Sequence, residues 1–180
     1  MTRSRPALGV IAALAVLAGC GTMKNAGDAM FGGDEQLPGL EAPLRPLPGS
    51  ALQGSVRFVS RHGGVMMLVS LNGLPPGQYR VMVHANGNCS SPNAFSAGPP
   101  WYGASGSPMI DRVPLVTTNT EGTAIATFRL AGVTLEQGPN ALRGRSVVVH
   151  DGAGASLDAQ PDVRNARIAC GLIGPLNTFF

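Results

Sequence analysis

Apolar and polar side chains alternate along several short segments between residues 51 and 175. Residues 56–60 and 79–84 alternate with a period of two, and residues 65–71 form a longer apolar run. A β-strand with one buried face has this pattern, so we expect strands at these three segments. Further strands are expected at 113–118, 123–130, 146–150 and 166–173.

Turn-forming residues separate the expected strands. Gly63-Gly64, Asn72-Gly73 and Pro76-Gly77 each follow or precede an alternating segment, and residues 85–112 form a long stretch rich in Gly, Pro, Ser and Asn. The composition agrees, with 25 Gly, 15 Pro and only 5% aromatic residues. Short strands joined by many turns predict an all-β fold, either a sandwich or a barrel.

The N-terminus has the pattern of a secretory signal peptide. Arg3 and Arg5 precede an apolar stretch from Ala7 to Ala18, which ends at Gly19-Cys20. The stretch is too short for a mature membrane-spanning helix. Leu17-Ala18-Gly19-Cys20 resembles a bacterial lipobox, which implies that residues 1–19 are removed and that Cys20 carries a lipid. An ordinary signal peptide with an incidental cysteine is the alternative interpretation.

These features predict an exported protein, attached through a lipid on Cys20 to the periplasmic face of a bacterial membrane. Gly21 follows Cys20, and the absence of an acidic residue there favours the outer membrane. Residues 20–50 are interpreted as a flexible tether, because Gly residues and closely spaced prolines disfavour a helix or a central strand. The folded domain is then expected at 51–175, followed by a short tail at 176–180.

The charge gives no support to nucleic-acid binding. The whole chain has 13 Lys and Arg against 10 Asp and Glu. Loss of Arg3 and Arg5 with the signal peptide leaves about one net positive charge, and no basic run of the kind that neutralises phosphates remains.

Two cysteines remain if Cys20 is lipidated. Cys89 and Cys170 form an even pair in an oxidising compartment, which favours a disulfide over two free thiols. The bond would close a loop of about 80 residues, for which the chain-entropy model gives roughly 4–5 kcal/mol of stabilisation.

Three stretches in order resemble the copper–zinc superoxide dismutase family. Residues 74–89 contain a Leu-Pro-Pro-Gly turn, a strand ending in Met-Val-His and then Cys89. The second stretch, residues 144–150, has the sequence Gly-Arg-Ser-Val-Val-Val-His. The third, residues 166–174, has the sequence Ala-Arg-Ile-Ala-Cys-Gly-Leu-Ile-Gly. The resemblance implies an eight-stranded Greek-key β-barrel. It also implies the pairing of Cys89 with Cys170.

The resemblance carries over only part of the family's copper site. His84 stands at the second position of the family's His-x-His pair, and His150 stands at the last copper ligand. Met82 replaces the first histidine of the pair, and Pro100 stands where the family has the histidine that bridges copper and zinc.

A zinc site is not expected. The family site uses six His and one Asp, whereas the whole chain has three His, one of which, His62, lies in a Gly-rich turn. Asp111 is near the expected zinc-ligand Asp, but zinc needs about four strong ligands, so we interpret it as a loop residue.

Arg167 matches the family's active-site arginine, which guides the superoxide anion by long-range charge. An arginine next to a disulfide can equally hold a loop by donating hydrogen bonds to its carbonyls. The sequence leaves both roles open.

Three functions of different class remain open, and the sequence does not decide whether the chain is an enzyme. A Cu(I) site could be formed by Met82, His84 and His150. The domain would then be a copper-binding module that takes up copper ions or passes them to a copper-handling protein. If Met82 only fills space, the domain is a metal-free barrel. The third is a copper-dependent superoxide dismutase with a reduced, zinc-free site.

Overall fold

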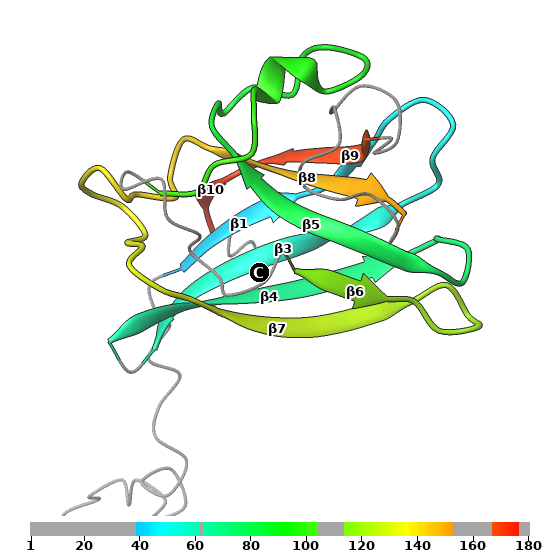
Figure 1. Ribbon diagram of the computed structural model, residues 1–180, viewed down its shortest axis with the longest axis horizontal. Coiled ribbons are helices and arrows are strands. Elements are labelled where there is room, and N and C mark those ends of the chain that lie inside the picture. Colours follow the sequence, from blue (N-terminus) through cyan, green and yellow to red (C-terminus); the bar gives the residue numbers. More distant parts are fainter. Residues whose placement is uncertain (1–38, 62, 104–113, 153–166, 177–180) are drawn as a thin grey trace, which may run out of the picture. The chain divides into compact units, whose positions relative to one another are not determined.

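A computed structural model describes residues 39–61, 63–103, 114–152 and 167–176. The described residues form two five-stranded antiparallel sheets (Figure 1). In order, the first sheet contains β10 (Gly174–Pro175), β1 (Gly39–Pro43), β3 (Gln53–Arg61), β4 (Gly64–Asn72) and β7 (Ala124–Leu130). In order, the second sheet contains β2 (Arg45–Pro46), β9 (Arg167–Leu172), β8 (Ser146–Asp151), β5 (Gln78–His84) and β6 (Leu115–Thr117).

The two sheets exchange strands at one corner. The chain passes from β1 in the first sheet to β2 in the second across Leu44, and it returns from β9 to β10 across Ile173. If each of these crossing runs is counted as one strand, the domain has the eight strands that the family resemblance implies. The pairing of β4 with β7 and of β5 with β8 joins strands that are not consecutive, as in Greek-key connections.

Inward-facing residues of both sheets form the main core. Val56 and Phe58 of β3 pair with Val69 and Met67 of β4, and all four side chains are buried. The second sheet contributes inward-facing valines from two adjacent strands, namely Val81, Val83, Val147 and Val149. The alternation of apolar and polar residues therefore predicts the buried face correctly, and the strands expected from residue 56 onward are confirmed to within three residues at each described end.

The folded domain starts earlier than we expected. The sequence pattern assigns residues 39–50 to the tether, but Gly39–Pro43 pairs along its whole length with β3, and Arg45–Pro46 pairs with β9. Prolines are tolerated because Pro43 ends β1 and Pro46 lies in an edge strand of two residues, where a missing N–H donor costs little. The predicted tether boundary at residue 50 is therefore wrong for residues 39–46.

The outer face of the second sheet carries the candidate site residues that the sequence predicts. Met82, Val148 and Cys170 lie opposite one another on β5, β8 and β9, while His150 lies between Arg80 and Arg167 on the same three strands. Residues 85–103 pack against this face. Its one short helical turn, η1 (Phe95–Ala97), places Ala97 and the preceding Ala94 against Val148 and Cys170.

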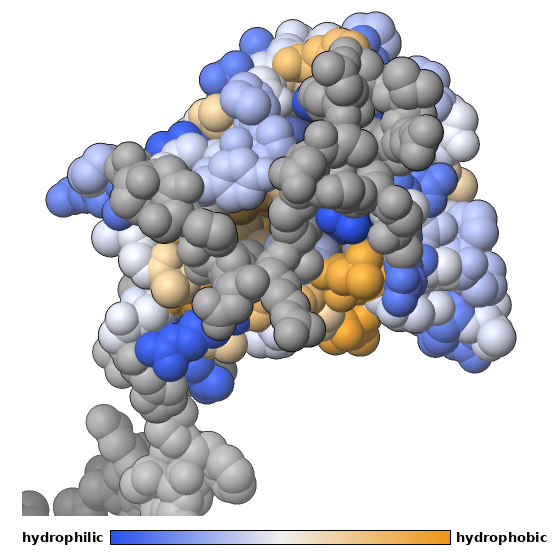
Figure 2. All heavy atoms as spheres, in the orientation of Figure 1, coloured by the Kyte–Doolittle hydropathy of each residue, from blue (hydrophilic) through white to orange (hydrophobic). Residues whose placement is uncertain are grey.

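The visible surface is mostly polar. Figure 2 shows apolar patches that are separated from one another on this face of the molecule. Within the described ranges, the large apolar side chains that are exposed lie on different elements: Leu68, Phe95, Leu115, Ile125 and Leu172. Among the described residues there is no helix with the length and apolar character that crossing a membrane requires.

Candidate metal centre

Two buried histidines face each other on the outer side of the second sheet. His84 ends β5 and His150 lies in β8, and their Nε2 atoms are 3.1 Å apart. The two rings are nearly parallel, with centroids 5.3 Å apart and an angle of 20° between their planes. His84 is fully buried and His150 is 6% exposed. The structure thus brings together two residues that are 66 positions apart in the sequence.

The Gly98 carbonyl determines which nitrogen of His84 carries the proton. His84 Nδ1 lies 2.8 Å from this oxygen. A carbonyl oxygen only accepts hydrogen bonds, so Nδ1 is the protonated nitrogen of the neutral ring. The Nε2 lone pair of His84 therefore points toward His150, whose Nε2–H donates to it in the metal-free pair.

Burial keeps His84 neutral over most of the pH range. Desolvation is the largest effect and lowers the pKa of His84 from 6.5 to about 3. The hydrogen bond to the Gly98 carbonyl acts in the opposite direction, while the nearby His150 and Arg167 lower the pKa further. A neutral imidazole is the form that binds metals.

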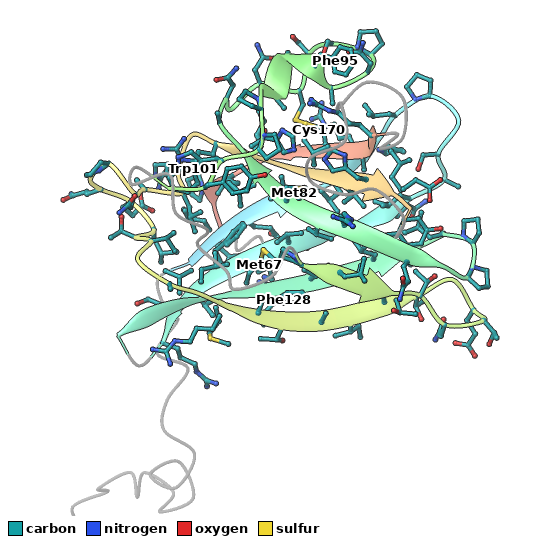
Figure 3. All side chains as sticks on the ribbon, in the orientation of Figure 1. Met67, Met82, Phe95, Trp101, Phe128 and Cys170 are labelled. Atoms are coloured by element: carbon teal, nitrogen blue, oxygen red, sulfur yellow. A yellow bond between two sulfur atoms is a disulfide. The ribbon has the colours of Figure 1, made fainter. Side chains whose placement is uncertain are left out.

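Met82 lies on the same strand face as His84, two residues earlier in β5. Its side chain is buried, at 9% exposed, but it belongs neither to the main core nor to the small cluster around Val148 and Cys170. It is the one buried apolar side chain in the described ranges for which this holds. Figure 3 shows Met82 on the side of β5 toward the 85–103 segment, whereas Met67 lies between the two sheets. This position favours a role outside the core for Met82.

Pro100 lies beside His84, as the resemblance implies. The two residues form an isolated antiparallel bridge, supported by Ala85 N–H donating to the Pro99 carbonyl and Trp101 N–H donating to the Val83 carbonyl. Pro100 has no imidazole to offer a metal and no backbone N–H. The position that holds the bridging histidine in the family therefore contributes no ligand here.

Arg167 holds the segment that covers the histidines. Its guanidinium donates to the carbonyl of Ala94 at 2.6 Å and to the carbonyl of Gly98 at 3.3 Å, and it lies 4.9 Å from the centre of the Phe95 ring. The loop-holding role that the sequence left open is therefore present in the structure. Guidance of an anion by Arg167 stays a prediction.

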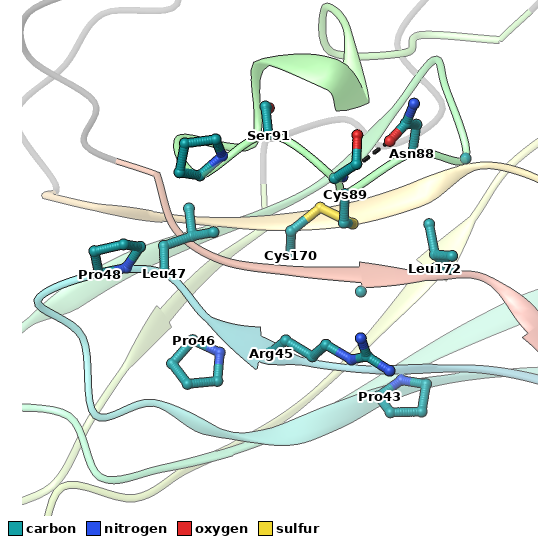
Figure 4. A pocket seen from close by; sticks show the side chains of 14 residues that line it. Pro43, Arg45, Pro46, Leu47, Pro48, Asn88, Cys89, Ser91, Cys170 and Leu172 are labelled. Atoms are coloured by element: carbon teal, nitrogen blue, oxygen red, sulfur yellow. Dashed lines mark hydrogen bonds between the residues drawn. A yellow bond between two sulfur atoms is a disulfide. The ribbon is translucent and has the colours of Figure 1, made fainter.

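The predicted disulfide is confirmed. Cys89 and Cys170 are bonded, with their Cα atoms 5.8 Å apart. The bond joins the 85–103 segment to β9 and packs against Ala94, Ala97 and Val148. Both cysteines line a surface groove of about 570 Å³ (Figure 4), together with Pro43, Arg45–Pro48, the rest of Gly87–Pro92, Gly171 and Leu172. Neither histidine lines this groove, so it is separate from the candidate metal centre.

The described residues do not fit the family's zinc site. Within the ranges that the structure covers, no three His, Cys, Asp or Glu side chains come close enough to hold one ion. A copper site with fewer ligands fits better. Two nitrogens that are 3.1 Å apart lie within the span that two metal–imidazole bonds of about 2 Å can bridge.

Three residues that the sequence singled out lie outside the described residues, namely Cys20, His62 and Asp111.

Sequence reasoning missed the Gly98 carbonyl, which contacts this site, and the position of Arg80 beside it. The Gly98 carbonyl orients His84, but a backbone acceptor leaves no signal in a side-chain motif. Arg80 lies opposite His150 on the neighbouring strand, in register with Arg167 on the other side. Its position follows from the strand pairing of β5 with β8, and the alternation of residues 79–84 could have placed it on the outer face.

Comparison with known proteins agrees with this architecture. A family model described as copper/zinc superoxide dismutase matches residues 52–173. A protein named superoxide dismutase [Cu-Zn] from Onchocerca volvulus is 30% identical over 146 residues, which cover 71% of this chain and 91% of that protein.

Proposed function

The chain belongs to the copper/zinc superoxide dismutase family, and from this premise we propose that it binds one copper ion as Cu(I) through Met82, His84 and His150, without full dismutase activity. The observation that carries the proposal is the 3.1 Å separation of two buried Nε2 atoms on a sheet face that also carries a buried thioether. A thioether ligand favours Cu(I), whereas imidazole binds copper and zinc alike, so Met82 is the ligand that selects for Cu(I).

The protein residues prepare this site before any ion arrives. The Gly98 carbonyl holds the proton of His84 on Nδ1, so that its Nε2 lone pair points inward. Ala94, Ala97 and the disulfide pack over the neighbouring Val148. This packing restricts the entry of water from that side. When bound, copper supplies a soft cation that accepts the nitrogen and sulfur lone pairs.

Low dismutase activity follows from the missing groups. In the family the bridging imidazole takes up a proton as copper is reduced, and Pro100 cannot do this. The whole chain has three histidines, too few for the family's zinc ligands, so we expect no neighbouring zinc to tune the copper. A site that holds Cu(I) without cycling it suits storage of copper or its delivery to a copper-handling protein. Attachment to the periplasmic face of the membrane through Cys20 is part of the same proposal.

A metal-free barrel is the second candidate. The 3.1 Å distance is also that of an ordinary N–H···N hydrogen bond, so the His84–His150 pair can be purely structural. Metal content separates the two candidates. After growth with added copper, we expect about one copper and no zinc per wild-type chain, and no copper in the double variant His84→Gln/His150→Gln. Wild-type protein without copper would favour the metal-free barrel.

A further inference from the structure

Gly98 connects two side chains of the proposed copper centre. Its carbonyl oxygen accepts from His84 Nδ1 at 2.8 Å and from Arg167 Nη2 at 3.3 Å. Arg167 also donates through Nη1 to the carbonyl of Ala94, four residues earlier. The Arg167 guanidinium thus bonds both ends of the turn from Ala94 to Gly98. The Gly98 carbonyl at the end of this turn orients His84.

The backbone of this turn adopts unfavourable conformations at both of its ends. Gly98 has φ 76° and ψ −162°, a conformation that glycine alone adopts readily. Ala94 is in the left-handed region at φ 56°, which is unfavourable for a residue with a Cβ atom. Backbone hydrogen bonds close the turn from Ala97 N–H to the Ala94 carbonyl and from Gly98 N–H to the Phe95 carbonyl. Further hydrogen bonds hold its middle, from Asn86 N–H to the Ala97 carbonyl and from Ser96 N–H to Ser91 Oγ. Among the described residues, Arg167 is the donor other than His84 that bonds the Gly98 carbonyl itself.

We infer that Arg167 is a positioning residue for the copper centre, which fixes the Nδ1–H tautomer of His84 by holding the Gly98 carbonyl against it. The inference rests on the proposed function and assigns Arg167 a task that does not depend on its long-range charge. If the carbonyl moves away, the His84 proton can shift to Nε2, where it blocks the lone pair that faces His150. Loss of such an outer-shell partner typically weakens metal binding about 10- to 100-fold.

Arg167→Lys separates positioning from charge. Lysine keeps the positive charge but replaces the two-pronged guanidinium with a single ammonium, which cannot bond both carbonyls in the same geometry. Arg167→Gln removes the charge as well. Arg129→Gln is the matched control, because Arg129 lies on β7 in the other sheet and the change removes the same charge. Gly98→Ala tests the carbonyl directly, because a Cβ atom there would lie 2.7 Å from Asn86 Nδ2.

The test uses the full mature, oxidised chain and two readouts. Nitrogen-15 NMR of the metal-free protein reports the His84 tautomer, and competition with a Cu(I) chelator reports affinity. We expect wild type and Arg129→Gln to show the Nδ1–H form, and the Arg167 variants and Gly98→Ala to show mixed tautomers with a 10- to 100-fold lower Cu(I) affinity. An unchanged tautomer in folded Arg167→Lys overturns the inference. A wild type that does not bind Cu(I) overturns the proposed function, while the tautomer shift still supports positioning by Arg167.

Discussion

His84 and His150 lie on adjacent strands of one sheet with their Nε2 atoms 3.1 Å apart, although neither residue is directly opposite the other in the strand register. His84 pairs with Ser146 and His150 pairs with Arg80. The two rings meet by reaching along the outer face of the sheet, over the pair formed by Met82 and Val148. A thioether therefore lies on the face that the two imidazoles share.

The disulfide is expected to contribute substantially to stability. Replacing both Cys89 and Cys170 with Ser should lower the free energy of unfolding by up to roughly 4–5 kcal/mol, because the bond closes a long loop in the unfolded chain. Chemical denaturation of the two proteins measures the difference. Intact mass before and after reduction of wild type should differ by two hydrogens. A double variant as stable as oxidised wild type would contradict this role of the bond.

Acid should destabilise the metal-free protein through His84. The folded-state pKa of about 3 is below the usual 6.5, so below pH 6.5 the unfolded chain binds a proton that the folded chain does not. Stability contributed by the neutral form is present above pH 6.5 and is lost as the pH falls toward 3, at up to about 1.4 kcal/mol per pH unit. His84→Gln should flatten this slope when denaturation is followed between pH 7 and 4. An identical slope in the variant would refute the assignment.

Copper-loaded protein should have little superoxide dismutase activity. The position beside His84 holds Pro100, which can neither accept nor donate the proton that the family's bridging imidazole transfers. Superoxide consumption per bound copper should be far below that of a family member with all its ligands, measured in the same assay. Turnover close to that of such an enzyme would show that the missing imidazole is not needed.

Membrane attachment is expected to depend on Cys20. If the lipobox interpretation is correct, wild type expressed in a Gram-negative bacterium is found in the membrane fraction, and Cys20→Ala is released from it. The mass of the mature N-terminal peptide should include the acyl chains. Wild-type protein recovered wholly in the soluble fraction would disprove lipidation.

The strands were predictable where one face is buried. Val81 and Val83 alternate with Met82 and His84, and this alternation places each side chain on its observed face. The first strand was missed because Pro43 and Pro46 resemble linker residues, and only pairing with β3 and β9 makes their positions favourable. That pairing joins segments that are distant in the sequence, so local patterns do not reveal it.

Only the site residues that lie in recognisable sequence motifs could be predicted. His84 and His150 were recognised from their places in two matched stretches, and the structure brings them together. The Gly98 carbonyl was not foreseen, because its contact with His84 depends on a turn conformation rather than on a side-chain type. Arg167 was recognised, but its hydrogen bonds to Ala94 and Gly98 required the folded loop.

The central claim is that Met82, His84 and His150 bind Cu(I), and competition with a Cu(I) chelator tests it most directly. Wild type, Met82→Leu, His150→Ala and the control Met67→Leu are titrated in ascorbate, with Met67 chosen because it is buried in the main core. We expect wild type and Met67→Leu to compete equally. His150→Ala should lose more than about 100-fold in affinity, since losing a ligand costs more than losing an outer-shell partner, and Met82→Leu should lose at least about tenfold. Equally weak competition by all four proteins would contradict the claim. The domain would then be better described as a metal-free barrel.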